Sequence, residues 1–236
     1  MRRGITHVEV RSLPGGRFPA VSDAEIEEFI GMVSAAGLAV SGVSPGFCKC
    51  DVEDEQVADA LATGLPRACE WALKMGTDMV SCFAFDRDDS EPIHSTNVPE
   101  LVIQRLGEMA DITAAHGCRL VLENEAVCWG ATGLEAAHIC RAVGTERLGL
   151  LWDPGNSCMA GSRAPLDEYA QLKDIVSHVH CKNFADGGWS LMESGVVDWP
   201  AQVRALEDDG YDGFLVIETC PSPPPPPALS PRLGLE

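Results

Sequence analysis

Short apolar segments rich in β-branched residues alternate with longer amphipathic segments along most of the chain. Each apolar segment has the length of a strand and is bounded by glycine or polar residues, as buried strands are. The pattern predicts seven strands, at Ile5–Arg11, Leu38–Val43, Met79–Phe85, Cys118–Glu123, Leu148–Asp153, Val176–Lys182 and Phe214–Glu218.

The amphipathic segments between these strands carry helix signals. Ser22 precedes the first segment and Glu25 follows three residues later, in the pattern of a capping box. Gly37, Gly76 and Gly144 follow three of the segments, and glycine commonly ends a helix. We expect helices at 22–36, 55–75 with a break at Pro66, 98–115, 133–143, 166–172 and 199–208.

This alternation indicates a parallel sheet whose strands are joined by helical crossovers. The strands are apolar on both faces, as in a sheet that is covered on both sides. No glycine-rich nucleotide fingerprint follows any strand, which favours a (β/α)8 TIM-barrel type over an open doubly wound sheet. We expect one barrel domain over residues 1–220 and a proline-rich, disordered tail at 221–236.

The chain is strongly acidic. It has 17 Lys and Arg against 36 Asp and Glu, a formal net charge of −19, so nucleic acid and anionic membranes are not expected partners. No apolar run reaches the roughly 18–20 residues of a membrane span, and MRRGITHVEV lacks the apolar core of a secretory signal. The ten cysteines include no CxxC pair, which argues against structural zinc. We therefore expect reduced thiols and a cytoplasmic protein.

Four of the predicted strands end in a metal-ligating side chain: Glu123, Asp153, His180 and Glu218. They lie 30, 27 and 38 residues apart, and one strand–helix unit takes roughly 30 residues. The carboxyl ends of barrel strands meet at one mouth, where barrel enzymes carry their sites. Taken singly, each residue is more commonly an exposed loop side chain. Together, three carboxylates and one imidazole indicate a site for Mn²⁺, Mg²⁺ or Co²⁺, with Fe²⁺ or Zn²⁺ as alternatives.

Other polar residues share faces with these ligands. Glu9 lies on the face of the first strand that also carries His7 and Arg11, so it is expected either to line the pocket and contact substrate or to form an ion pair inside the barrel. His178 shares the face of His180 and is interpreted as a packed histidine. Glu125 is expected either to support the ligands from behind or to face solvent, and we favour solvent.

The series VLEN, LLWDPGN, HVHCKN, GVVDW and GYDGFLVIE resembles the sugar phosphate isomerase/epimerase family, which consists of xylose-isomerase-like TIM barrels. The resemblance runs from about Ile5 to Glu218. It implies that Glu123, Asp153, His180 and Glu218 bind one divalent metal and that the two glutamates transfer protons.

The chain departs from the family pattern in several places. Asn156 and Asn183 stand where His and Asp are common, and a full strand and helix usually precede a segment like GITHVEVR. The helix expected after LVIET is also missing. We therefore expect an open barrel, without its first βα unit and closing helix, whose unpaired edge strands favour homo-oligomers.

The function that these features imply is a divalent-metal-dependent isomerase or epimerase of a sugar, sugar phosphate or polyol ketone. Glu123 and Glu218 would transfer protons through an enediolate, with Lys182 and Asn156 contacting substrate oxygens. Two alternatives stay open: a dehydratase of a cyclic polyol ketone, as in inosose or dehydroshikimate dehydratases, and an inactive, truncated barrel.

Overall fold

Seven parallel strands form one curved sheet in the computed structural model, which describes residues 4–88, 90–93, 96–144, 146 and 148–218. The strand order is β1-β4-β5-β7-β9-β10-β13. The bounds are β1 His7–Val10, β4 Ala39–Phe47, β5 Met79–Cys82, β7 Arg119–Glu123, β9 Leu148–Trp152, β10 Val176–Cys181 and β13 Leu215–Ile217. The seven strands predicted from the sequence are therefore confirmed, and together they make a nearly closed barrel.

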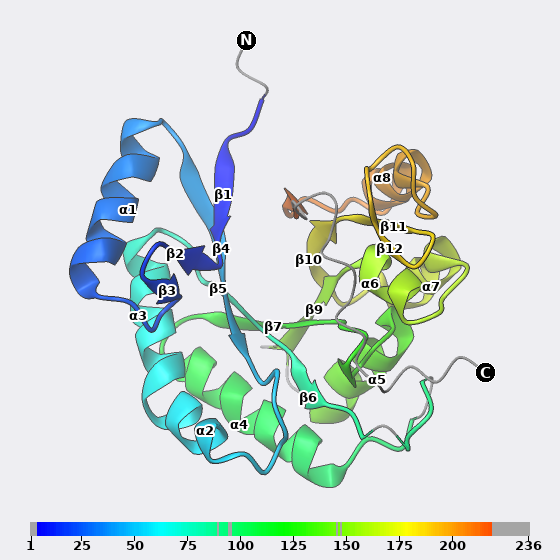
Figure 1. Ribbon diagram of the computed structural model, residues 1–236, viewed down its shortest axis with the longest axis horizontal. Coiled ribbons are helices and arrows are strands. Elements are labelled where there is room, and N and C mark those ends of the chain that lie inside the picture. Colours follow the sequence, from blue (N-terminus) through cyan, green and yellow to red (C-terminus); the bar gives the residue numbers. More distant parts are fainter. Residues whose placement is uncertain (1–3, 89, 94–95, 145, 147, 219–236) are drawn as a thin grey trace.

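Helices cover the outside of the sheet (Figure 1). Their bounds are α1 Asp23–Ala35, α2 Glu55–Asp59, α3 Leu65–Lys74, α4 Glu100–Ala115, α5 Gly133–Val143, α6 Pro154–Met159, α7 Pro165–Leu172 and α8 Trp199–Asp208. The Ser22 side chain accepts a hydrogen bond from the Glu25 N–H and so caps α1. α5 begins with a full capping box between Thr132 and Glu135 and ends at the left-handed Gly144.

The helix predicted at 55–75 is interrupted just before Pro66, although the chain stays helical there. A π-helical turn, Ala60–Gly64, joins α2 to α3, and Pro66 lies in the first turn of α3. Proline is tolerated there because that turn does not need its N–H. The sequence also missed α6 and three short antiparallel pairs, which have too few residues for a periodic signal. The pairs are β2 Ser12–Leu13 with β3 Gly16–Arg17, β6 Ala84–Asp86 with β8 Cys128–Trp129, and β11 Asn183–Ala185 with β12 Gly188–Ser190.

The barrel interior is divided along its axis. Met79, Val121 and Leu151 form a small apolar cluster, and Gly42 leaves room for the Met79 side chain, since a Cβ there would lie 2.1 Å from Met79 Cε. Two residues further along the same faces come Glu123 and Asp153, because side chains alternate along a strand. The main hydrophobic core lies mostly between the sheet and the helices. Polar side chains thus occupy the carboxyl end of the barrel.

The sheet is open between its first and last strands. In the part of the chain described, β1 pairs only with β4 and β13 only with β10. Side chains nevertheless meet across this seam: the rings of His7 and Phe214 lie 4.5 Å apart, and an ion pair of 2.9 Å joins Arg11 to Glu218. The predicted open barrel is therefore confirmed, whereas the expected homo-oligomer stays a prediction. The predicted tail at 221–236 lies outside the described residues.

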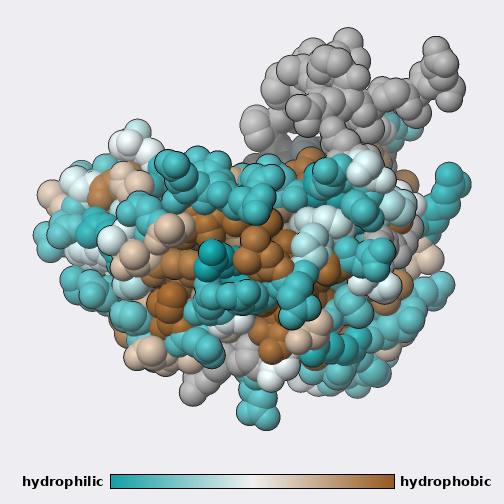
Figure 2. Space-filling view, turned by 90° about the horizontal axis from the view of Figure 1, so that it is seen from below, coloured by the Kyte–Doolittle hydropathy of each residue, from teal (hydrophilic) through white to brown (hydrophobic). Residues whose placement is uncertain are grey.

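Hydrophobic side chains are exposed on the last strand, where Leu215 and Ile217 lie beside the seam. Figure 2 shows the face seen from below in Figure 1, where hydrophobic residues gather in the middle around a few hydrophilic ones and hydrophilic residues predominate along the border. Among the helices of the described residues, none is long and apolar enough to span a membrane.

Candidate metal centre and active site

Four strands bring the predicted ligands together at the carboxyl end of the barrel. Glu123 is the last residue of β7, Asp153 follows β9, His180 lies in β10 and Glu218 follows β13. Their candidate ligand atoms all lie within 4.8 Å of one another. The four residues predicted from the sequence therefore lie together, and their roles as metal ligands and proton carriers remain predictions.

Asp153 is fixed by its own backbone and by a neighbouring amide. Its backbone N–H donates to Asn124 Oδ1 at 2.8 Å, and Asn124 Nδ2 donates back to its carbonyl at 2.9 Å. Asp153 Oδ1 accepts from the N–H of Asn156 at 2.8 Å and so caps α6. Oδ2 is left turned toward the other ligands. Sequence reasoning missed Asn124, whose only signal was an amide directly after the strand end.

Asn156 supports Glu123. Its Nδ2 donates to the Asn124 carbonyl at 2.7 Å and to Glu123 Oε1 at 3.3 Å. The residue is fully buried, and its Oδ1 has no hydrogen-bond partner among the described residues. The structure thus places Asn156 behind Glu123, and the substrate contact expected from the sequence stays a prediction.

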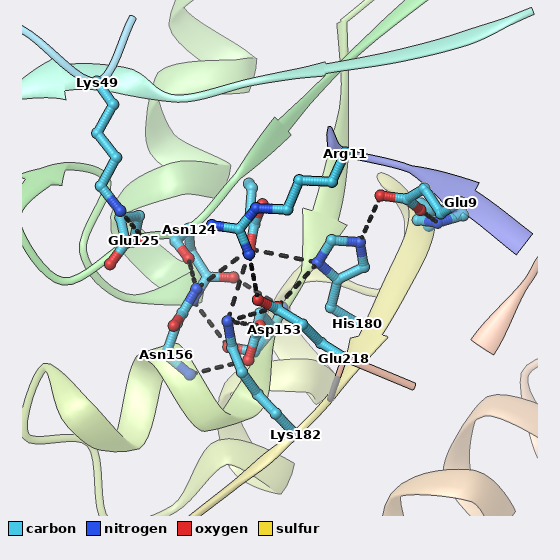
Figure 3. A network of polar contacts seen from close by, with 12 residues as sticks. Glu9, Arg11, Lys49, Asn124, Glu125, Asp153, Asn156, His180, Lys182 and Glu218 are labelled. Atoms are coloured by element: carbon cyan, nitrogen blue, oxygen red, sulfur yellow. Dashed lines mark hydrogen bonds and ion pairs between the residues drawn. The ribbon is translucent and has the colours of Figure 1, made fainter. Parts of the chain in front are cut away.

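Lys182 extends into the middle of the cluster (Figure 3). Its Nζ lies 2.7 Å from Glu218 Oε2, 2.9 Å from Asp153 Oδ2 and 3.9 Å from Glu123 Oε1. The ring of Trp189, in β12, lies 4.8 Å from the same nitrogen. One buried ammonium therefore balances part of the charge of three carboxylates.

The buried charges shift one another's protonation. Burial raises the pKa of Asp153 to about 7; the Lys182 ammonium opposes this shift and the Glu123 carboxylate adds to it. Burial by itself would lower the pKa of His180, but Glu123 and Glu9 outweigh it and hold that pKa well above its usual value. Burial also opposes the charged form of Lys182, but the carboxylates of Asp153, Glu123 and Glu218 outweigh it and raise the pKa of Lys182. Asp153, His180 and Lys182 therefore all hold their protons to higher pH than they would in water.

Glu9 reaches the site from β1, across the open seam. Its Oε1 lies 3.0 Å from His180 Nε2 and its Oε2 lies 2.7 Å from His178 Nε2. Burial favours a raised pKa for Glu9, but the charge of His180 and hydrogen bonds from both rings lower it below the ordinary range. Of the two roles expected for Glu9, the structure shows the ion pair, and its carboxylate also lines the pocket.

A divalent cation fits this set of residues. The ring of His180 turns Nδ1 toward the carboxylates, 3.3 Å from Glu123 Oε1 and 3.6 Å from Glu218 Oε2. Asp153 Oδ2 is buried without a hydrogen-bond donor in the described residues, since its contact with Lys182 is an ion pair that lacks hydrogen-bond geometry. Three oxygen donors and one imidazole suit Mn²⁺, Mg²⁺, Co²⁺ or Fe²⁺.

A cavity of about 220 Å³ opens above the cluster and has room for a small polar molecule. The residues that line it include Glu9, Glu123, His180, Lys182 and Glu218, together with Arg11, Ser44, Phe83 and Glu125. The expectation that Glu125 faces solvent is wrong: it is 8% exposed and pairs with Lys49 at 2.7 Å. Lys49 reaches it from the loop after β4, which the sequence pattern did not place near this strand.

Comparison with known proteins agrees with this geometry. The chain matches the family described as xylose isomerase-like TIM barrel over residues 2–233. It therefore belongs to that family, and the resemblance found in the sequence motifs is confirmed.

Two curated relatives match about half of the chain. The rhizopine catabolism protein MocC of Rhizobium meliloti is 29% identical over an alignment of 134 residues, and the match covers 49% of this chain and 41% of the relative. An inosose dehydratase of Lacticaseibacillus casei is 20% identical over an alignment of 149 residues, and the match covers 55% of this chain and 50% of the relative. The aligned regions thus span half or less of the curated relatives.

Solved structures share the fold. A xylose isomerase-like TIM barrel protein from Mycobacterium smegmatis in complex with magnesium has a TM-score of 0.71 and 22% identity, covering 91% of this chain and 77% of the other. A D-tagatose 3-epimerase-like protein has a TM-score of 0.72 and 19% identity, covering 89% and 80%. Since both identities are low, these likenesses concern the barrel itself.

Proposed function

We propose that this xylose isomerase-like barrel is a divalent-metal-dependent isomerase or epimerase of a sugar or a related polyol ketone. One observation carries the proposal: four strands bring Glu123, Asp153, His180 and Glu218 within 4.8 Å of one another beside a small cavity. These four residues would hold the metal. When bound there, a divalent cation supplies Lewis-acid polarisation of a substrate carbonyl.

The chain itself supplies two carboxylates for proton transfer. Glu123 and Glu218 come from strands that are separated by β9 and β10 in the sheet, so they face the cavity from different directions. One carboxylate removes the proton from the carbon next to the carbonyl, giving an enediolate. If the other returns a proton to the opposite face, the product is an epimer; if the proton returns to the neighbouring carbon, the product is the aldose or ketose isomer.

Cationic side chains position these groups. Lys182 donates a hydrogen bond to Glu218 Oε2 at 2.7 Å and Arg11 donates one to Oε1 at 2.9 Å, so both oxygens of this carboxylate are oriented. Lys182 also lines the cavity, where its ammonium group is available to a substrate oxygen. Because the pKa of Lys182 is raised, it stays protonated and acts as a hydrogen-bond donor rather than a base.

The name of one relative, inosose dehydratase, keeps elimination of water from a cyclic polyol ketone as the competing outcome at the same site. The fate of the β-hydroxyl separates the two reactions. An isomerase or epimerase gives a product of the same molecular formula as the substrate, whereas a dehydratase releases one water.

The test is a screen of ketoses and cyclic polyol ketones with the chain stripped by chelator and then reloaded with Mn²⁺, in D₂O. Mass spectrometry of the products is expected to show deuterium at the carbon next to the carbonyl with the carbon skeleton and oxygens unchanged. Loss of water assigns the dehydratase. If the chain binds no metal, or if no deuterium enters any substrate, the proposal is wrong. His180→Ala is the control that should be inactive.

A further inference from the structure

Glu9 has no part in the set of four ligands, yet it is buried beside one of them. Its side chain is 7% exposed, and it comes from β1, on the opposite side of the seam from β10. Isolated carboxylates are costly to bury, so a buried one is normally paired. Both oxygens of Glu9 are used, one on His178 Nε2 and the other on His180 Nε2.

The two nitrogens of His180 consequently face different partners. Nε2 lies 3.0 Å from Glu9 Oε1, whereas Nδ1 lies 3.3 Å from Glu123 Oε1 and 3.6 Å from Glu218 Oε2. Figure 3 shows the ring between Glu9 and the carboxylate cluster. A histidine ligates a metal through an unprotonated nitrogen, and the hydrogen bond at the other nitrogen decides which one that is. When a metal binds beside Glu123 and Glu218, one ring nitrogen must be unprotonated, and the carboxylate at Nε2 keeps the remaining proton there and leaves Nδ1 to the metal.

His178 fixes the carboxylate in turn. Its Nε2 lies 2.7 Å from Glu9 Oε2, and the ring is 2% exposed. His178 also borders a second cavity, at the amino end of the strands, with His7 and Phe214. A continuous row of three side chains thus runs through the barrel, from that cavity to the candidate metal centre.

We infer that Glu9 is a positioning residue of the candidate metal centre. It keeps the proton of His180 on Nε2, so that the unprotonated Nδ1 faces the carboxylates of the centre, and His178 holds Glu9 in place. The inference rests on the proposed function, because Glu9 can support a metal ligand only if His180 binds a metal. It differs from a purely structural ion pair across the seam, which would stabilise the fold without changing the affinity for metal.

The experiment compares Mn²⁺ dissociation constants, from electron paramagnetic resonance titration, for the parent chain, Glu9→Gln and Glu125→Gln. Loss of such a supporting partner typically weakens metal binding about 10- to 100-fold, and this is expected for Glu9→Gln. Glu125→Gln is the matched control, because it removes one charge from the same cavity at a residue paired with Lys49. Its dissociation constant is expected to stay within about threefold of the parent value.

A spectroscopic measurement tests the tautomer directly. With ¹⁵N-labelled histidine and Mg²⁺, the parent chain is expected to show His180 protonated at Nε2 and not at Nδ1, the resonance being assigned from its absence in His180→Gln. His178→Asn should weaken Mn²⁺ binding less than Glu9→Gln does, because it acts through Glu9. This variant and the parent spectrum also decide the matter if Glu9→Gln does not fold.

The outcomes are separable. If Glu9→Gln binds Mn²⁺ like the parent chain, or if His180 is protonated at Nδ1 when Mg²⁺ is bound, the positioning role is wrong and the metal centre stands. If Glu9→Gln unfolds more easily with an unchanged dissociation constant, the ion pair is only structural, and the inference is again overturned. A parent chain that binds no Mn²⁺ overturns the metal centre of the proposed function, and the inference with it.

Discussion

Glu123 ends β7, a strand with a hydrogen-bonded neighbour on each side, whereas Glu218 follows β13, which pairs only with β10 in the described residues. The side chain of Glu123 is 5% exposed and that of Glu218 is 22% exposed. Glu123 contacts His180 and the amide of Asn156, whereas Glu218 accepts hydrogen bonds from two cations, the buried Lys182 and the exposed Arg11.

This difference assigns distinct properties to the two halves of the site. Ligands on paired strands are held by packing and need little rearrangement, as a preorganised site requires. A ligand next to an edge strand depends on its ionic partners, and edge regions open locally at lower free-energy cost. We therefore expect Glu123 and Asp153 to form a fixed wall and Glu218 to be the adjustable ligand.

The largest expected effect is on catalysis. Glu218→Gln keeps an oxygen donor but removes a base, so it should retain much of the metal binding while kcat falls about 10²–10⁴-fold. Glu123→Gln should lose a similar factor in kcat and more metal affinity, because its amide would face both His180 and Asn156 in a fixed position. Solvent-deuterium exchange into the substrate, with metal occupancy verified, measures both. Exchange by Glu218→Gln at the parental rate would show that the proton passes through another group.

Metal should stabilise the fold. A ligand that binds only the folded state adds roughly 2.7 kcal/mol at a hundredfold excess over Kd, so Mn²⁺ should raise Tm. His180→Ala should abolish this response, and a normal response there would mean that the wrong histidine was chosen.

Hydrogen exchange locates the effect: residues 215–217 should gain protection with Mn²⁺, while β7 should change little. Equal gains in both strands would contradict the contrast between wall and edge.

Asp153 should make the stability of the metal-free chain depend on pH. Because the pKa of Asp153 is raised to about 7 from the ordinary 3.8, the folded chain retains a proton that the unfolded chain has lost between these values. The stability of the metal-free chain should therefore fall as the pH rises from 5 to 7. The raised pKa of His180 acts in the same direction above pH 6.5.

Glu9 and Glu123 affect stability in the opposite direction, but their effect changes only at pH values below this range. Glu9 and Glu123 have lowered pKa values, so the stability that they add is complete above their ordinary value of 4.5. Urea unfolding in the presence of EDTA, from pH 5 to pH 8, measures the slope. Asp153→Asn should flatten the slope between pH 5 and 7. An equal slope in this variant would assign the effect to other groups.

The four candidate ligands were easier to predict from the sequence than the residues that support them. Glu123, Asp153, His180 and Glu218 stand at strand ends, and the carboxyl ends of barrel strands meet at one mouth. The support from Asn124 and the pair between Lys49 and Glu125 depend on loops, whose paths have no periodic signal. The contact of Glu9 with His180 crosses a seam between strands that are not hydrogen-bonded to each other, so no register rule relates the two positions.

The smallest expected effect concerns the ion pair across the seam. Arg11 is 57% exposed in its pair with Glu218, and exposed pairs contribute about 0.2–1 kcal/mol. Arg11→Met should lower global stability by no more than that, and the loss should shrink at high salt. Its local effect should be larger, because Arg11 joins the two edge strands: residues 215–217 should exchange hydrogen faster.

Arg119→Met is the matched control. It breaks a similarly exposed pair with Asp78, but at the start of β5 and β7, which are joined by hydrogen bonds along their length. This variant should lose comparable global stability without faster exchange in either strand, because the backbone ladder holds them together. If Arg11→Met leaves exchange at 215–217 unchanged, Glu218 does not depend on its ionic partner, and the edge of the site is as rigid as the wall.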